Sequence, residues 1–511
     1  MFAGARVLRD RYVDSVELLA ITRRMRQTEG VDFATALMGT PANLEALQEQ
    51  GVAGEVLTAT PNDLVLAARA TDAARAEQAL DQAERALSAP PTGAARRGER
   101  EPRSLQAALD RLGDANVAIV SVAGGYAALE AHKALSAGLH VLLFSDNVSV
   151  EEEIALKEHA AGVRRLAMGP GAGTASIGGC GLGFANAVAP GRVGVVAAAG
   201  TGAQEVMALL DRWGEGVSHV IGVGGRDLSR RVAGRSARLA MQTLARDPGT
   251  DVIVLVSKPP SPDVARAVVA AGAGTPVIAA LIGLAPGTSV PGASAVAATL
   301  EAAAAHAVRQ RGGSPPSDWS EWRSHVALSL VELGPERRTV RGLFSGGTLC
   351  YEAQTLLRRW LGDVWSNTPL EERLRAPAPA SAHVCLDLGD EEHTKGRPHP
   401  MIDAEARLGL LAEAGNDDDV AVVLLDVVLG YGGHDDPAAV LAPACAAVAR
   451  PAGPRVVAYV LGTDKDPQGL ARQRRAFEEA GCLVAPTAAR AALAAAAVAR
   501  RQSEIVEADL S

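Results

Sequence analysis

Apolar residues recur along much of the chain in short runs, each followed by a stretch with helical spacing. Valine-rich runs at residues 193–196 and 252–256 belong to one such series, and runs at 340–344, 420–426 and 456–461 belong to a second. Continuous apolar runs of this length, separated by amphipathic segments, are typical of parallel strands that helices cover on both faces. The pattern therefore predicts an α/β fold with two similar doubly wound parts.

Changes in this pattern divide the chain into four predicted domains. Helical stretches that alternate with short strand candidates, such as residues 63–68, predict a small α+β domain over residues 1–90. Alternating strand and helix patterns predict a compact Rossmann-like domain over residues 104–168. Two flavodoxin-like domains follow at residues 169–311 and 339–511, and a glycine- and proline-rich break at residues 312–318 separates them.

A glycine-rich turn opens a predicted helix in each flavodoxin-like domain. The first turn is Gly200-Thr201-Gly202, and the second is Ser345-Gly346-Gly347-Thr348. Glycine lets a ligand approach the backbone, and the unpaired amides of a helix N-terminus attract phosphate or carboxylate. We therefore expect one anion to be held between two helix N-termini. The alternative is that these residues serve turn geometry alone.

Composition narrows the class of function. The formal net charge is −9 and only 3% of residues are aromatic, so the chain lacks the basic face and stacking platforms that nucleic acid requires. The five cysteines show no CxxC spacing, which predicts neither a metal site nor a disulfide framework. The apolar runs are too short for a membrane span, and no signal peptide precedes Arg6. We expect a cytoplasmic protein that binds neither nucleic acid nor membrane.

Motifs spread over nearly the whole chain resemble a known family. The first glycine turn together with Gly224-Gly225-Arg226-Asp227 resembles the ligase domain of the succinyl-CoA synthetase α subunit, and the last third resembles the matching β-subunit domain. Phe344-Ser-Gly-Gly-Thr348, Lys395-Gly-Arg-Pro-His-Pro-Met-Ile-Asp403 and Leu425-Asp-Val-Val-Leu-Gly-Tyr-Gly432 identify the chain as a member of the FdrA family, which joins both halves. The resemblance implies a Rossmann-like domain followed by two flavodoxin-like, succinyl-CoA synthetase-like domains.

The chain departs from the thiokinase pattern at its catalytic loop. Thiokinases carry phosphate on a histidine in a Gly-His-Ala-Gly loop, and the equivalent loop at residues 287–294 has Ala293 at that place. Lys258 matches the glutamate that orients this histidine. The chain also has no ATP-grasp segment between its halves and no opening glycine loop for CoA phosphates. We therefore expect no phosphohistidine relay and no ATP-dependent thioester synthesis by this chain alone.

The family resemblance also implies an activity. FdrA-type proteins are associated with allantoin and oxamate catabolism, as one component of an oxamate carbamoyltransferase. The implied reaction moves a carbamoyl group between oxamate and phosphate, with carbamoyl phosphate or CoA as ligand and with other transferase subunits and a second copy of the chain as partners. The alternatives are an acyl-CoA synthetase relative without phosphohistidine and a non-catalytic scaffold subunit.

Individual residues have a functional and a structural interpretation. Lys258 follows a strand end, where it could neutralise phosphate, or it is a surface lysine. His399, held between prolines, is the candidate for proton transfer, with loop ordering as the alternative. Arg226 and Asp227 either bind substrate or brace each other.

Further substrate-binding candidates lie in the last domain. They are Arg397 and the segment Gly432-Gly433-His434, whose alternative role is that of a solvated loop. Asp387 and Asp426 sit in or beside apolar strands, and we expect them to accept hydrogen bonds from backbone amides, with a role in ligand binding as the alternative.

Overall fold

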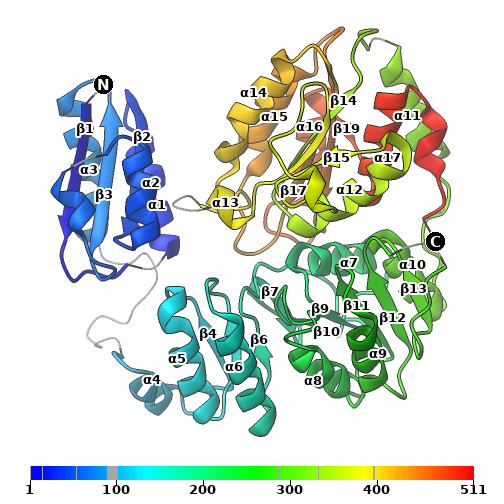
Figure 1. Cartoon of the computed structure of the whole chain (residues 1–511), viewed down its shortest axis with the longest axis horizontal. Coiled ribbons are helices and arrows are strands. Elements are labelled where there is room, and N and C mark those ends of the chain that lie inside the picture. The colour runs from blue at the N-terminus through cyan, green and yellow to red at the C-terminus, as the bar shows by residue number, and fades with distance from the viewer. Residues whose placement is uncertain are drawn as a thin grey trace. The chain divides into compact units, whose positions relative to one another are not determined.

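The computed structural model describes residues 2–13, 15–52, 54–88, 102–284, 287–331, 333–394 and 398–510. The chain forms two compact units (Figure 1). The first is Met1–Pro102 with Glu391–His399, and the second is Arg103–Asp390 with Pro400–Ser511. No helix in the described part of the chain is long and apolar enough to cross a membrane.

The first unit is an antiparallel sheet with helices on both faces. Its strand order is β1-β3-β2. Strand β3 alternates its side chains, so Leu64 and Leu66 pack against one layer while Val65 packs against the other. The elements are β1 (Phe2–Leu8), α1 (Ser15–Arg26), β2 (Val31–Met38), α2 (Pro41–Glu49), η1 (Glu55–Thr58), β3 (Leu64–Ala70), α3 (Ala73–Ser88) and α13 (Glu391–Thr394).

The second unit begins with a three-stranded parallel sheet of order β4-β5-β6. Helix α6 begins with a capping box, in which Ser149 and Glu152 each bond the other's backbone amide. The elements are α4 (Leu105–Leu112), β4 (Val117–Val120), α5 (Gly124–Ser136), β5 (His140–Leu143), α6 (Val150–Gly162) and β6 (Ala167–Met168).

A seven-stranded sheet follows and defines what we call the seven-stranded domain. Its order is β13-β12-β11-β9-β10-β7-β8, parallel except for the hairpin β7–β8, which pairs antiparallel to β10. The elements are β7 (Thr174–Ile177), β8 (Cys180–Gly183), β9 (Val193–Ala197), α7 (Gly200–Arg212), β10 (His219–Gly222), α8 (Arg235–Leu244), β11 (Val252–Ser257), α9 (Pro262–Ala271), β12 (Val277–Leu281), β13 (Ala295–Ala297) and α10 (Leu300–Gln310).

Helix α11 (Ser320–Leu330) leads to the six-stranded domain, whose sheet is parallel with the order β15-β16-β14-β17-β18-β19. Its elements are β14 (Thr339–Phe344), α12 (Gly347–Leu361), β15 (Val364–Trp365), η2 (Glu372–Leu374), β16 (His383–Asp387), η3 (Ala404–Arg407), α14 (Leu408–Asn416), β17 (Val420–Val428), α15 (Pro437–Val448), β18 (Arg455–Leu461), α16 (Leu470–Glu479), β19 (Leu483–Val484), α17 (Ala488–Arg500) and η4 (Ser503–Glu507).

Both larger sheets have the flavodoxin-like strand order 2-1-3-4-5. In the seven-stranded domain this series is β10-β9-β11-β12-β13, and in the six-stranded domain it is β16-β14-β17-β18-β19. The expected fold class is therefore confirmed. In such sheets a ligand crevice lies outside the carboxyl end of the first strand, where the strand order reverses. These positions are the ends of β9 and β14, which lead directly into α7 and α12.

The two domains share one hydrophobic core, to which α7, α10, α12 and α17 all contribute. Helix α17 is buried along ten consecutive residues, seven of which are alanine. Because alanine side chains are small, neighbouring helices can approach α17 closely on several sides. Helices α7 and α12 lie against each other within this core (Figure 1).

Candidate functional site

The N-termini of α7 and α12 lie side by side. A Cβ atom at Gly346 would stand 2.7 Å from Thr201 Cγ2, and one at Gly202 would stand 3.0 Å from Thr348 Cγ2. The first turn of α7 therefore packs against the first turn of α12. The sequence predicted that these two glycine-rich segments lie together. Neither N-cap residue, Ala199 for α7 or Gly346 for α12, makes a capping hydrogen bond with its own side chain. The first-turn amides therefore remain available to an anion.

Part of the second turn is already occupied by a carboxylate of the protein. Asp426, within strand β17, accepts hydrogen bonds from the Ser345 amide at 2.7 Å, the Ser345 hydroxyl at 2.8 Å and the Gly346 amide at 2.9 Å. Arg407 offsets its charge across a buried ion pair of 3.3 Å. The predicted anion contact by the Ser345 and Gly346 amides is thus corrected: these amides hold Asp426. The amides of Gly347 and Thr348 remain as candidates.

Lys258 and Asp387 reach α12 from two different domains. Lys258 is exposed just after β11, and its Nζ lies 5.1 Å from the ring centre of Tyr351 on α12. Asp387 ends β16, and a side chain at Gly347 would collide with its carboxylate. Burial raises the pKa of Asp387 to about 6, although the nearby Lys258 ammonium acts in the opposite direction. A cation and a carboxyl group of near-neutral pKa therefore stand beside the start of α12.

A hydroxyl group that sequence reasoning missed lies beside the glycine-rich segment Gly200-Thr201-Gly202. A Cβ at Gly200 would lie 3.5 Å from Thr174 Oγ1, at the start of strand β7. Gly200 itself is exposed, so the start of α7 opens to solvent. Strand β7 was not predicted because its four residues, Thr174–Ile177, are too short to show a periodic pattern.

The two helices also repeat a glutamate that sequence reasoning did not single out. Glu205 and Glu352 follow the first glycine of their helices at the same spacing and are buried. Glu205 accepts hydrogen bonds from the Tyr459 hydroxyl at 2.5 Å and the Ala488 amide at 3.2 Å. Glu352 accepts one from the Leu300 amide at 2.6 Å. Each domain thus places a carboxyl group on the first residue of a helix of the other domain.

Burial raises the pKa of both glutamates. The pKa of Glu205 rises to about 7 and that of Glu352 to about 8. The second oxygen of Glu352 has no hydrogen-bond partner among the described residues. The signal that could have identified this pair is the Gly-Thr-x-x-x-Glu spacing shared by the two turns.

Arg226 and Asp227 lie in a different, largely structural network. Asp227 is fully buried and accepts hydrogen bonds from Lys157 Nζ at 2.7 Å and from two amides at the start of α8. Arg226 pairs with Glu153 at 3.0 Å, and Glu153 also pairs with Lys157 at 2.7 Å. The two predicted substrate ligands therefore neither brace each other nor offer Asp227 to a ligand. They join the Rossmann-like domain to the seven-stranded domain.

The remaining predicted residues are not brought to the helix N-termini by any described contact. In the segment Gly432-Gly433-His434, Gly432 has a φ of +79° and packs on Phe184, while the His434 amide donates to the Met401 carbonyl at 2.8 Å. His399 belongs to the segment that groups with the first unit, so its role stays a prediction. Arg397 lies outside the described residues.

Family comparisons agree with this architecture. The family model described as CoA-ligase matches residues 343–498, and the one described as AllF, heavy metal-associated domain, matches residues 1–103. Residues 1–103 contain no cysteine, so the thiolate ligands that soft metal ions prefer are absent from this segment. Among the described residues, no group of three or more His, Cys, Asp or Glu could hold a metal ion.

Individual relatives extend the comparison. The succinate–CoA ligase [ADP-forming] subunit alpha of Methanothermobacter thermautotrophicus is 27% identical over 148 residues, which is 28% of this chain and 49% of that subunit. A solved dinucleotide-forming acetyl-coenzyme A synthetase 1 from Ca. Korarchaeum cryptofilum is similar with 16% identity and a TM-score of 0.27, covering 76% of this chain and 84% of that one.

One relative matches over nearly its full length. The uncharacterized protein YahF of Escherichia coli K12 is 37% identical over 499 residues, which cover 95% of this chain and 96% of YahF. The chain therefore belongs to the FdrA/YahF family of succinyl-CoA synthetase-like proteins.

Proposed function

We propose that the chain is the acyl-transfer component of an oxamate carbamoyltransferase, in which phosphate and a carbamoyl group react between the N-termini of α7 and α12. The observation that carries this proposal is the side-by-side packing of these two uncapped helix starts at the switch points of two sheets. Two helix ends and an ammonium group can together offset the charge of a phosphorylated ligand.

The reaction requires one bond to form and one to break. A phosphate oxygen attacks the carbonyl carbon of the carbamoyl group carried on the oxamate nitrogen, and the bond from this carbon to nitrogen then breaks. The nitrogen takes up a proton, which leaves oxamate and carbamoyl phosphate. The transition state places negative charge on the carbonyl oxygen, so oriented amides lower the barrier without a protein nucleophile.

Two side chains fit the remaining requirements. Lys258, beside Tyr351 on α12, would neutralise the phosphate. Asp387, whose pKa burial raises to about 6, is protonated in part near neutral pH and would supply the proton to the leaving nitrogen. A protonated Asp387 also avoids repulsion between its carboxyl group and the phosphate. His399 remains a second candidate for this proton transfer.

The alternative function is acyl-CoA chemistry without phosphohistidine, or a scaffold that binds an acyl phosphate for partner subunits. The match of residues 343–498 to the CoA-ligase family favours the first of these alternatives. We expect other transferase subunits and a second copy of the chain as partners in any of these functions, in a cytoplasmic assembly.

Phosphorolysis of N-carbamoyl oxamate with labelled phosphate tests the proposal. The purified chain, alone and with transferase subunits co-expressed from neighbouring genes, should yield labelled carbamoyl phosphate in at least the second case. Gly409→Ala, where a Cβ meets no atom within 4 Å, is the control, and Gly347→Val should remove the product. Formation of acyl-CoA without carbamoyl phosphate would favour the alternative. If the chain bound phosphate but formed neither carbamoyl phosphate nor acyl-CoA, the result would favour the scaffold function.

A further inference from the structure

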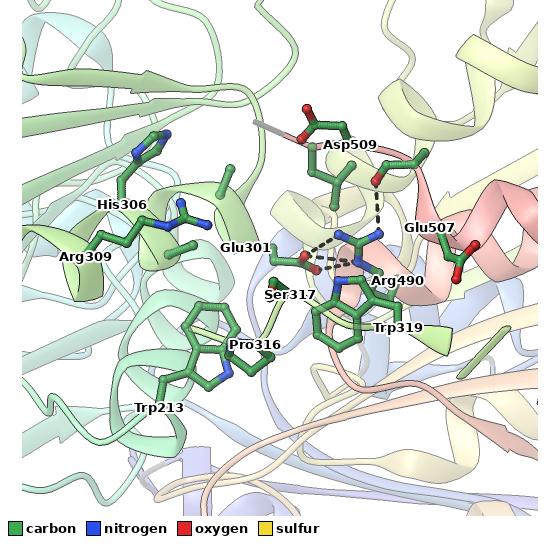
Figure 2. Close-up of a pocket in the computed structure, with 14 residues that line it drawn as sticks. Trp213, Glu301, His306, Arg309, Pro316, Ser317, Trp319, Arg490, Glu507 and Asp509 are labelled. Atoms are coloured by element: carbon green, nitrogen blue, oxygen red, sulfur yellow. Dashed lines mark hydrogen bonds and ion pairs between the residues drawn. The ribbon is translucent and has the colours of Figure 1, made fainter. Parts of the chain in front are cut away.

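A cavity in the larger unit lies at the opposite end of α7 from the candidate site. Its volume is about 280 Å³, and it is bounded by α10, the connection that follows α10, the start of α17 and the C-terminal segment (Figure 2). Trp213, the C-cap of the 13-residue helix α7, forms part of its wall. A helix of that length spans about 20 Å, so this cavity is distinct from the candidate site at Gly200, the first residue of α7.

Aromatic side chains are concentrated here in a chain that has few of them. Only 5 of the 511 residues are tryptophan, yet Trp213 and Trp319 both line this cavity, together with Pro316. Both indoles are only partly buried, so they present area to a ligand. Flat faces of this kind favour a planar ring, which can stack on an indole.

The charges that line the cavity are unequally neutralised. Glu301 is held by the buried Arg490 at 2.7 Å, and Glu507 is held by Arg323 at 2.9 Å. Arg490 in turn lies 4.8 Å from the ring centre of Trp319. Arg309, in contrast, makes no side-chain hydrogen bond or ion pair with any described residue and is exposed at the cavity. One guanidinium group is therefore left to meet an anion.

Polar groups beside Arg309 complete the edge of the cavity. In Figure 2, His306 and Arg309 lie on one side of the hollow, and Trp319 and Arg490 lie on the other. Partial burial and the charge of Arg309 lower the pKa of His306, so its imidazole is neutral at pH 7 and can donate or accept a hydrogen bond. Asp509 also lines the cavity.

We propose that this cavity binds a planar nitrogen heterocycle that carries an anionic group, of the size of a nucleoside monophosphate. The ring stacks on the indoles of Trp213 and Trp319, and the anionic group contacts Arg309. The volume of about 280 Å³ lies at the small end of the range for ligand pockets in proteins, about 300–1,000 Å³, so the cavity has room for no more than one molecule of this size. The cavity joins α10 of one domain to α17 of the other, so an occupant would contact both domains at their junction.

Titration of the full-length chain with AMP tests this site, by calorimetry and by the quenching of tryptophan fluorescence. AMP should bind saturably, adenosine about tenfold more weakly because it lacks the charged hydrogen bond, and ribose 5-phosphate without measurable affinity because it lacks the ring. Arg309→Gln should reduce AMP affinity to that of adenosine and leave adenosine binding unchanged. Arg338→Gln, at an exposed arginine outside the cavity, is the matched control.

A second pair of variants separates stacking from folding. Trp213→Phe should retain AMP binding because a flat ring remains, whereas Trp213→Leu should lose it, with melting curves confirming that both variants fold. Absence of AMP binding to the folded wild-type chain would overturn the proposal. Equal affinity in Arg309→Gln and wild type would also overturn it, as would a preference for tetramethylammonium, which identifies an aromatic site for cations instead.

Discussion

At the scale of single residues, the start of α12 combines a cation, a carboxyl group and a glycine that admits no side chain. Lys258 approaches from the seven-stranded domain, while Gly347 and Asp387 belong to the six-stranded domain. A ligand at this place would therefore contact residues far apart in the sequence. Each of the three can be changed by itself.

Lys258→Ala should weaken the binding of carbamoyl phosphate by about 1.5–3 kcal/mol, the scale of a hydrogen bond to a charged group. Lys258→Arg should restore most of the affinity because it keeps the charge. Lys133→Ala, at another exposed lysine, is the control. Calorimetric titration measures the change, and unchanged affinity in Lys258→Ala would remove this lysine from the site.

Gly347→Val should abolish ligand binding and lower stability by about 1–3 kcal/mol, because the new side chain displaces the Asp387 carboxylate. The control is Gly409→Ala. Gly409 lies in helix α14, where an added Cβ would have open space, so this substitution should leave stability unchanged or raise it slightly. Denaturant unfolding with titration distinguishes these effects. If Gly347→Val kept full affinity, the ligand could not contact the start of α12.

Sequence patterns identified part of this site because glycine turns have a local signature. The paired turns and Lys258 were predicted from residues next to strand ends. Asp426 was expected to accept hydrogen bonds from backbone amides. Which amides it binds, those of Ser345 and Gly346, depends on the pairing of β17 with β14. Asp227 was misjudged for the same reason, since Lys157, 70 residues away, determines its surroundings.

At the scale of elements, α7 and α12 each bury a glutamate one turn and a half below the candidate site. Glu205 faces Tyr459 on β18, the start of α17 and, at longer range, Arg212 and Glu301. Glu352 faces the start of α10, with Glu205 and Glu301 nearby. Ionisation of either group would place a buried negative charge between the two domains, which Arg212 offsets only in part for Glu205.

The pH dependence of stability follows from the raised pKa values. Between pH 4.5 and about 7 for Glu205, or about 8 for Glu352, the folded chain keeps a proton that the unfolded chain releases. This contribution to stability is complete below pH 4.5 and is lost as pH rises through that window. The free energy of unfolding of Glu352→Gln should therefore fall less than that of wild type between pH 5.5 and 9, as measured by chemical unfolding. If the free energies of both proteins changed with pH in parallel, Glu352 would be ionised throughout this range.

Strand predictions succeeded where continuous apolar runs were long enough. Residues 252–256 were predicted and lie within β11, and residues 420–426 became the longer β17. Strand β1 was missed because half-buried small residues give no clear alternation. Strand β13 was missed because it has three residues, and it forms only by pairing with β12.

At the scale of the whole molecule, the chain combines succinyl-CoA synthetase-like domains with a loop at residues 287–294 that contains no histidine. Ala293 stands in the loop where the family resemblance expects histidine, and it packs against the core of the seven-stranded domain. Membership of the FdrA/YahF family therefore does not imply the succinyl-CoA synthetase reaction.

Incubation with γ-labelled ATP should leave the protein unlabelled, because no imidazole is present at the expected loop to accept the phosphoryl group. A succinyl-CoA synthetase treated in parallel provides the positive control and should carry acid-labile phosphate. Acid-labile label on this chain would show that another residue takes the part of the missing histidine.

The connection between the two domains has a consequence for how the paired helix starts assemble. Helices α7 and α12 belong to one polypeptide, joined through α10 and α11. Their encounter is therefore intramolecular, with an effective concentration set by the connecting chain. The ratio of the two halves is fixed at synthesis, dilution cannot separate them, and neither half can be exchanged for a different partner.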